Sequence, residues 1–345
     1  MATTILKFEV TKLDLPLVNP FVIATGVRTV AFNVLIKVFL DNGVVGLGEV
    51  SPPSSAAQSA QTEIIELINK IIPFFMGKAI EDFIGLIEKM HTQFPNVYGA
   101  QSGIELALYD AFTKCNKSSL FNYFGGKSRR LMTDITIPIG TTENALNLAN
   151  QYIGEGFRAL KMKVGKDRAA DFERVLAVSK IDSSVAIYLD ANQGYTKEEA
   201  YSVCQNLVDH GVNLEMFEQP VKKDDWEGLK YLTSKLNVEI AADESVVTFA
   251  DAQKLVEGNY VDVINIKLHK SGLVEAVKII EFAQKNSVTL MIGAMMESPI
   301  GLSASVQLAC GTNAFTYCDL DTVYLLKPTE YNGGFSYKGP EFTIL

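Results

Sequence analysis

The sequence predicts an α/β protein of two parts, a smaller α+β unit at the N-terminus and a parallel (β/α)7β barrel after it. Three observations support this prediction. The chain has 345 residues, more than one ordinary domain needs. Near the N-terminus its apolar residues alternate with a period of two and then follow a helical period. From Asp134 onward, short β-rich runs are each followed by about a dozen residues of helical period.

The N-terminal part is predicted to be an α+β unit that spans residues 1–125. From Ile5 to Val50 apolar and polar residues alternate around Asp41-Asn42-Gly43, a sequence typical of a tight turn, which indicates an antiparallel meander. Between residues 56 and 115 the apolar residues recur with helical spacing. The Ser- and Pro-rich segment 51–59 is expected to be a mobile loop. Strands followed by helices favour an α+β unit.

The repeating part is predicted to be a barrel over residues 126–322. Its apolar runs end at eight positions that lie 24 to 28 residues apart, and this constant spacing favours a closed parallel barrel over an open sheet. The run ends are Ile139, Lys163, Asp190, Glu218, Asp243, Lys267, Gly293 and Asp319. No helical stretch follows the last run, so the eighth helix is expected to be missing or short. Residues 323–345 form a separate segment, of which 335–345 is expected to return to the N-terminal unit and lie against it.

Composition excludes several classes of protein. The net charge is -9, from 40 acidic and 31 basic residues, and no block of Lys and Arg occurs, which argues against nucleic acid or an anionic membrane as a partner. No apolar run approaches the ~18 residues that a membrane span needs. Four cysteines without a Cys-x-x-Cys spacing indicate free thiols in a reducing compartment. We therefore expect a cytoplasmic protein that acts on a small molecule, and a homo-oligomer is left open.

Carboxylates at three successive run ends predict a metal site. Asp190, Glu218 and Asp243 each close a run, and barrels carry their active sites at the carboxyl ends of the strands. A set of ligands that offers only oxygen favours Mg²⁺ over Zn²⁺. Each acid alone could instead cap the helix that follows it. Their recurrence on consecutive strands favours the metal site.

The positions of three lysines indicate proton transfer beside this metal site. Lys161 and Lys163 lie two residues apart, so both face the same side of their strand, and Lys267 closes the sixth run, across the barrel. A surface ion pair is the alternative for any one of them. Mg²⁺ on a substrate carboxylate makes the adjacent α-proton removable, and neighbouring cations lower the pKa of a lysine enough for it to act as the base. One lysine on each face of the enediolate would take the proton and return it to the opposite face, which yields the epimer.

Taken together, these motifs resemble the enolase superfamily and, within it, the muconate lactonizing enzyme subgroup. The resemblance covers nearly the whole chain and rests on Lys161-Met162-Lys163, Asp190-Ala191-Asn192, Glu218-Gln219-Pro220, Ala242-Asp243-Glu244-Ser245 and Asn265-Ile266-Lys267. It implies a TIM-like (β/α)7β barrel under a capping domain that the C-terminal tail completes. It also implies that Asp190, Glu218 and Asp243 bind Mg²⁺, that Lys163 and Lys267 are the acid/base pair, and that Lys161 helps to hold the substrate carboxylate.

The eighth run narrows the reaction. Asp319 and Asp321 lie two residues apart, so both would face the barrel mouth, where a pair of acids suits an ammonium group. The pair could also merely cap its loop. The pattern resembles the dipeptide epimerases, in which it holds the α-ammonium of the substrate. The expectation is a Mg²⁺-dependent epimerase that inverts the C-terminal residue of Ala-X dipeptides. An N-acylamino acid racemase, an o-succinylbenzoate synthase, a cycloisomerase or a metal-binding barrel without turnover are the alternatives.

The side chain X is left open by the sequence. Arg28, in the loop 24–28 that the resemblance places over the barrel mouth, could bind an acidic side chain, and an ordinary surface arginine is as good an interpretation. Met295, Met296 and Ile300 after the seventh run would suit an apolar side chain. Thr136, on the first run, is a further candidate for a substrate contact.

Overall fold

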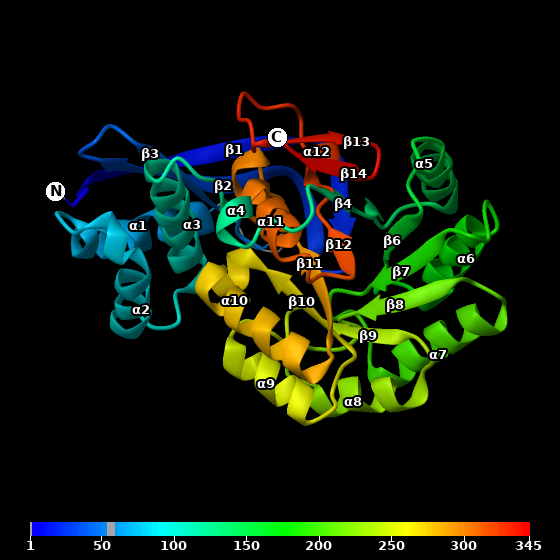
Figure 1. Ribbon diagram of the computed structural model, residues 1–345. Coiled ribbons are helices and arrows are strands. Elements are labelled where there is room, and N and C mark those ends of the chain that lie inside the picture. The colour runs from blue at the N-terminus through cyan, green and yellow to red at the C-terminus, as the bar shows by residue number, and fades with distance from the viewer. Residues whose placement is uncertain (1, 54–58) are drawn as a thin grey trace.

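The computed structural model describes residues 2–53 and 59–345 (Figure 1). Most of the expected loop between the last N-terminal strand and the first helix, residues 54–58, lies outside them. None of the helices in the described part of the chain combines the length and the apolar character required to cross a bilayer.

The N-terminal unit is the predicted antiparallel meander covered by helices. Strands β1 (Ile5–Ile23), β2 (Gly26–Leu40) and β3 (Val45–Val50) pair in that order. The helices are α1 (Ser59–Ile71), α2 (Phe83–Gln93), α3 (Tyr98–Cys115) and the single turn α4 (Leu120–Tyr123). Helix α3 packs on β3 so closely that a Cβ on Gly46 or Gly48 would lie 2.3 or 2.2 Å from a backbone oxygen of the helix. Only glycine fits at these two positions.

The second unit is an eight-stranded parallel barrel with helices on its outside (Figure 1). Its strands are β5 (Ile135–Ile137), β6 (Ala159–Lys163), β7 (Ala186–Asp190), β8 (Leu214–Glu218), β9 (Glu239–Ala242), β10 (Val263–Lys267), β11 (Thr289–Gly293) and β12 (Tyr317–Asp319). Its helices are α5 (Thr142–Gly154), α6 (Arg168–Ser179), α7 (Lys197–Asp209), α8 (Trp226–Lys235), α9 (Phe249–Glu257), α10 (Leu268–Asn286) and α11 (Pro299–Thr312). The Asp134 N–H donates to the Cys318 carbonyl (2.9 Å) and so joins the first and last strands. Six of the eight strands end at the predicted residue, which confirms the barrel.

The last turn, α12 (Thr322–Leu325), confirms the short eighth helix. Directly after it, Leu326 forms a bridge with Leu17, and the Lys327 N–H donates to the Pro16 carbonyl (2.9 Å), so this part of the C-terminal segment does reach the N-terminal sheet. The final hairpin also lies beside the N-terminal unit, since Ile344 and Leu345 line a cavity together with Leu47 and Leu106. Strands β13 (Phe335–Lys338) and β14 (Glu341–Ile344) add to β4 (Arg130–Met132), which joins the two units, because the edge of β4 offers unpaired backbone groups.

Two buried glutamates fasten the N-terminal unit to the barrel. The Glu49 carboxylate, from β3, accepts hydrogen bonds from the backbone N–H groups of Ser298 (2.9 Å) and Gly301 (3.0 Å) at the start of α11. The Glu105 carboxylate, from α3, accepts from Leu273 (2.8 Å) and from the residue after it, where α10 resumes beyond a kink. Carboxylates at helix N-termini satisfy free backbone donors and complement the helix dipole. The N-terminal unit is thereby held over the carboxyl ends of the barrel strands.

Candidate active site

A cavity of about 470 Å³ lies at the carboxyl ends of the barrel strands. The N-terminal unit covers it with the hairpin between β1 and β2, whose residues Phe21, Ile23 and Thr25 line the cavity. Seven of the predicted site residues also line it, namely Thr136, Lys163, Asp243, Lys267, Met296, Asp319 and Asp321. The other predicted barrel residues, Lys161, Asp190 and Glu218, are completely buried. The barrel thus brings all the predicted metal ligands and lysines to one end.

Lys161 lies at the centre of the acidic groups. Its ammonium nitrogen is 2.6 Å from Glu218 Oε2, 2.7 Å from Asp319 Oδ2 and 3.1 Å from Asp190 Oδ2. Burial alone would lower the pKa of Lys161, but these carboxylates outweigh burial and raise the pKa well above that of a free lysine. Lys161 is therefore a permanent cation in this arrangement, suited to holding a carboxylate.

The two predicted bases each pair with one predicted metal ligand. Lys163 Nζ is 2.5 Å from Asp190 Oδ2, and Lys267 Nζ is 2.7 Å from Asp243 Oδ2. Asp243 also pairs with Lys270 (2.6 Å), a residue that the sequence analysis missed. Lys270 lies in the first turn of α10, and no pattern in the sequence distinguishes it from a solvent-exposed lysine.

The pKa values of this cluster follow from its charges. Burial would lower the pKa of Lys267, but Asp243 and Glu218 outweigh burial and raise it. Burial would likewise raise the pKa values of Asp190 and Asp243, but their lysine partners hold both below the usual range. A lysine in such a pair is an ammonium, so it becomes a base only when positive charge offsets its acidic neighbours.

The residues present fit a hard divalent cation. Asp190, Glu218 and Asp243 offer only oxygen atoms, and each comes from a different neighbouring strand. Glu218 Oε1 accepts from Asn265 Nδ2 (2.7 Å), and its buried Oε2 lies 2.6 Å from the Lys161 ammonium nitrogen. These three residues could therefore hold Mg²⁺.

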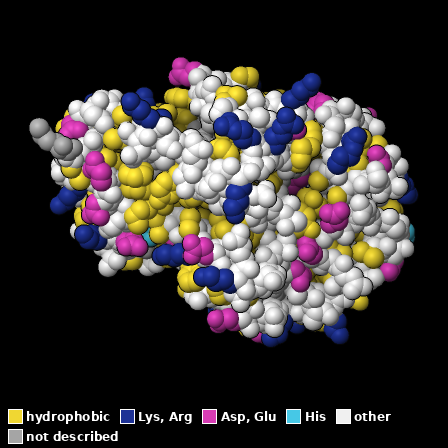
Figure 2. Space-filling model, in the orientation of Figure 1, with side chains coloured by type: hydrophobic (Ala, Val, Ile, Leu, Met, Phe, Trp, Pro, Cys, Tyr) yellow, Lys and Arg dark blue, Asp and Glu magenta, His cyan; other side chains and the backbone are white. Residues whose placement is uncertain are grey.

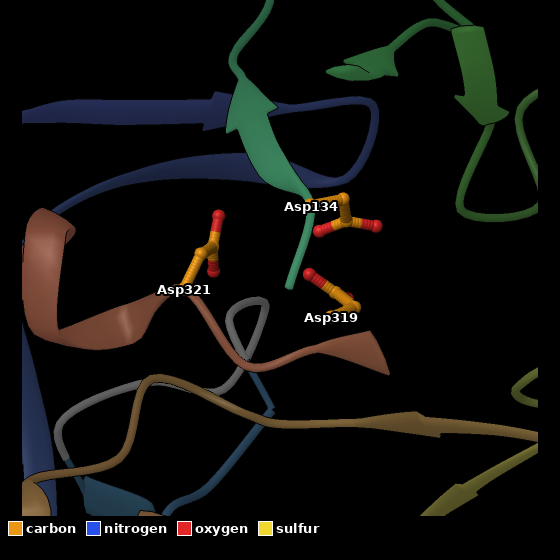
Figure 3. A group of neighbouring side chains, drawn as sticks. All are labelled: Asp134, Asp319 and Asp321. Carbon is orange, nitrogen blue, oxygen red and sulfur yellow. The ribbon is translucent and has the colours of Figure 1, made fainter. Parts of the chain in front are cut away.

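A second acidic group lies beside the first. Asp134, Asp319 and Asp321 place one oxygen each within 4.8 Å of one another, and Asp134 and Asp319 point toward each other from the first and last strands (Figure 3). Burial and Asp319 raise the pKa of Asp134, and they also raise the pKa of Asp321, to about 6. The Thr136 N–H orients Asp321 by donating to its Oδ2 (2.7 Å). Crowded carboxylates that resist ionisation are stabilised by an incoming cation.

Asp134 was not predicted from the sequence. It precedes its strand instead of ending it, and strand ends were the signal used to find the other acids. In the structure both of its oxygens are buried, and no described residue donates a hydrogen bond to either. An ammonium group placed between Asp134, Asp319 and Asp321 would supply such donors.

The backbone of Lys163 is positioned by a buried ion pair, Arg174 and Asp171, that the sequence analysis also missed. Arg174, on α6, donates to the Lys163 carbonyl (2.7 Å) and to Asp171 Oδ1 (2.6 Å). Asp171 Oδ2 accepts from the Gly165 N–H (2.8 Å) and from the Tyr195 hydroxyl (2.6 Å). The i,i+3 spacing of an acid and an arginine was visible in the sequence, but the spacing alone is typical of an exposed helix face.

The remaining candidates lie as follows. Thr136 and Met296 both line the cavity. Arg28 is not among its described lining residues; it is buried, and its Nη2 donates to the Pro53 carbonyl (2.5 Å). Burial lowers the pKa of Arg28.

Acidic and basic side chains are mixed on the face shown in Figure 2, which has no block of a single sign. All four cysteines are free thiols.

Comparison with known proteins agrees with this geometry. Residues 7–125 match the mandelate racemase / muconate lactonizing enzyme N-terminal domain, and residues 144–342 match the enolase C-terminal domain-like family. The chain is 38% identical to an L-Ala-D/L-amino acid epimerase of Populus trichocarpa, over 98% of this chain and 82% of that protein. It resembles the substrate-liganded L-Ala-D/L-Glu epimerase of Bacillus subtilis with a TM-score of 0.94 and 32% identity, over 99% of this chain and 96% of that chain. A dipeptide epimerase of Enterococcus faecalis V583, complexed with Mg and L-Leu-L-Tyr, gives a TM-score of 0.93 and 33% identity, over 99% and 97% of the two chains.

Proposed function

The chain belongs to the mandelate racemase / muconate lactonizing enzyme family, with an enolase C-terminal domain-like barrel, and from this premise we propose that it is a Mg²⁺-dependent dipeptide epimerase. The observation that carries the proposal is the placement of two lysines on opposite sides of one acidic cluster. Lys163 ends β6 and Lys267 ends β10, which lie four strands apart in the eight-stranded order. Both lysines line the cavity, so a substrate carbon between them is approached from two faces.

The acidic group formed by Asp134, Asp319 and Asp321 supports a dipeptide as the substrate. These side chains would bind the α-ammonium of the first residue, and Thr136 would keep Asp321 in place. Lys161 would hold the carboxylate of the second residue, since it is a buried cation beside the metal ligands. In a dipeptide bound in this way, the α-carbon of the second residue would lie between the two base lysines, which both line the cavity.

The proposed reaction inverts that α-carbon. A Mg²⁺ ion held by Asp190, Glu218 and Asp243 would supply positive charge that stabilises the substrate carboxylate as the α-proton leaves. One of Lys163 and Lys267, neutral at the start, takes the proton on its own face. The other, an ammonium at the start, delivers a proton to the opposite face. The net change is the configuration of one carbon.

The same acidic group disfavours the other reactions considered. Muconate and succinylbenzoate carry only carboxylates, and an N-acylated amino acid has no ammonium, so none of them would compensate three buried acids.

The free thiols support the expected cytoplasmic location.

Deuterium incorporation from D₂O tests the proposal. The Mg²⁺-loaded protein is incubated with a dipeptide library, and mass spectrometry follows the uptake of one deuteron per dipeptide. We expect uptake and epimer formation with dipeptides, and neither after exhaustive chelation. Exchange with N-acylated amino acids and with no dipeptide would contradict the proposal.

A further inference from the structure

We propose that the second side chain of the substrate is neutral and apolar, and that Ile23 and Thr25 at the tip of the β1–β2 hairpin, together with Met296, select it over an acidic one. This inference rests on the proposed dipeptide epimerase function and names the class of dipeptide that the site takes.

The direction of the second side chain follows from the positions of the other groups. In the proposed binding mode its α-carbon lies between Lys163 and Lys267, its carboxylate points to Lys161, and the peptide bond leads to Asp319 and Asp321 at the end of β12. The remaining direction is upward, out of the barrel and toward the hairpin. Phe21 and Ile23 follow the period of two along β1 and present one face to the cavity, Thr25 lies in the turn after β1, and all three line the cavity. The Ile139 N–H donates to the Val22 carbonyl (2.9 Å) and fixes the hairpin over the mouth.

The wall that meets this side chain is apolar. Phe21 and Ile23 belong to one hydrophobic cluster with Met296, Ile300 and the residues around α12, which lie at the β11–β12 side of the mouth. Phe21 and Ile23 are 9% and 7% exposed, so they are already packed and form a fixed surface. Met296 is unbranched and can adapt to side chains of different shape. Phe21, Ile23 and Met296 therefore offer burial to an apolar side chain at this wall, where Thr25 contributes a neutral hydroxyl.

An acidic side chain would need a cation, and two of the cations described near the cavity, Arg28 and Lys270, are engaged with other groups. Arg28 pairs with Phe21 across the hairpin, yet its guanidinium is bound to the Pro53 carbonyl and to further groups. Lys270 is paired with Asp243. Lys223, on the loop after β8, lines the cavity but is exposed, so solvent and salt screen its charge.

Residues 54–58, which lie outside the described part of the chain, have the sequence Ser-Ser-Ala-Ala-Gln and contain no cationic side chain. A buried carboxylate without a partner is strongly disfavoured. We therefore expect L-Ala-L-Leu and L-Ala-L-Met to exceed L-Ala-L-Glu in kcat/KM by about 100-fold or more.

The test compares these three dipeptides with the wild-type protein and with two hairpin variants, all loaded with Mg²⁺. Thr25→Arg places a cation inside the cavity, and we expect it to raise kcat/KM for L-Ala-L-Glu relative to L-Ala-L-Leu by about 10-fold or more. The matched control is Val27→Arg, on the opposite face of the same hairpin, where Val27 is 60% exposed. The control should leave the ratio unchanged.

Binding to a protein in which both base lysines are alanine, measured by calorimetry, should give the same ranking of dipeptides without turnover. A wild-type preference for L-Ala-L-Glu would overturn the inference and leave the dipeptide epimerase proposal intact. An equal effect of Thr25→Arg and Val27→Arg on the ratio would also overturn the inference. Absence of exchange with every dipeptide would overturn both proposals.

Discussion

Arg174 is expected to control one face of the reaction, because it holds the backbone of one base lysine. Its side chain is 2% exposed and donates to the Lys163 carbonyl and to Asp171. The substitution Arg174→Met keeps the apolar stem and removes both hydrogen bonds. The end of β6 is then free to shift, and the ammonium of Lys163 shifts with it.

The size of the effect follows from the partners that remain. Breaking a buried ion pair by removing one member costs about 3–5 kcal/mol. Asp171 keeps its hydrogen bonds from the Gly165 N–H and the Tyr195 hydroxyl, so we expect the lower end, about 3 kcal/mol of unfolding free energy. Replacing Asp171 by Asn in the Arg174→Met variant removes the carboxylate charge that has lost its arginine partner. The double variant should therefore lose less stability than the sum of the two single variants.

Two measurements check this prediction. Urea unfolding gives the stability of the variants. Proton NMR in D₂O gives the rate of α-proton loss from each pure epimer, and the epimer that fails to exchange in Lys163→Ala identifies the face of Lys163. Exchange of that epimer should fall about 10- to 100-fold in Arg174→Met, whereas exchange of the other should stay within about twofold of wild type.

A matched control is available at the other end of the same strand. Arg158 donates to the carbonyls of Ile153 (3.2 Å) and Phe157 (2.9 Å) just before β6 begins. Arg158→Met should leave the exchange of both epimers unchanged. Equal losses of exchange on both faces in Arg174→Met, or a loss as large in Arg158→Met, would refute the reasoning.

Three further predictions concern the metal, the ammonium site and the domain interface. Chelation should abolish turnover and Mg²⁺ should restore it; full activity after exhaustive chelation would refute a metal site. Asp321→Asn should raise KM for dipeptides far more than KM for an N-acylated amino acid, and equal changes would leave the residue a structural role. Because the pKa of Asp321 is raised to about 6, the wild-type KM for dipeptides should also rise as the pH falls below about 6. Burial and Glu49 raise the pKa of Glu297 to about 8, so wild-type stability should fall as the pH rises through 8, and Glu297→Gln should remove that loss in urea unfolding at pH 7 and pH 9. The same change of unfolding free energy between pH 7 and pH 9 in the wild type and in Glu297→Gln would contradict this prediction.

The barrel was predictable because its strand ends are marked in the sequence itself. Apolar runs stop where polar side chains enter the mouth, and Lys163, Asp190 and Glu218 are the last residues of their strands. The first strand was placed two residues too long, at Ile139. It ends at Ile137 because Pro138 has no N–H to donate to the sheet. The partner of the C-terminal hairpin was not predictable, since strand pairing over such a separation leaves no local pattern.

Part of the site depends on contacts around the barrel that no single run reveals. Asp134 precedes its strand but reaches Asp319, because strands in a closed barrel are staggered against one another. Lys270 and Arg174 lie on helices, and only the packing of those helices turns them toward the site. For Arg28, no sequence pattern distinguishes a side chain that faces the substrate from one bound to a neighbouring carbonyl.

The central claim, one lysine for each face, is tested most directly by isotope exchange in Lys163→Ala and Lys267→Ala. Each folded, Mg²⁺-loaded variant is mixed with each pure epimer in D₂O, and NMR follows the α-proton signal. Net epimerisation should disappear in both variants, because inversion needs both lysines. Exchange should survive in each variant for a single epimer, and that epimer should differ between the two. Interconversion of the epimers at near the wild-type rate by either variant would contradict the two-base mechanism.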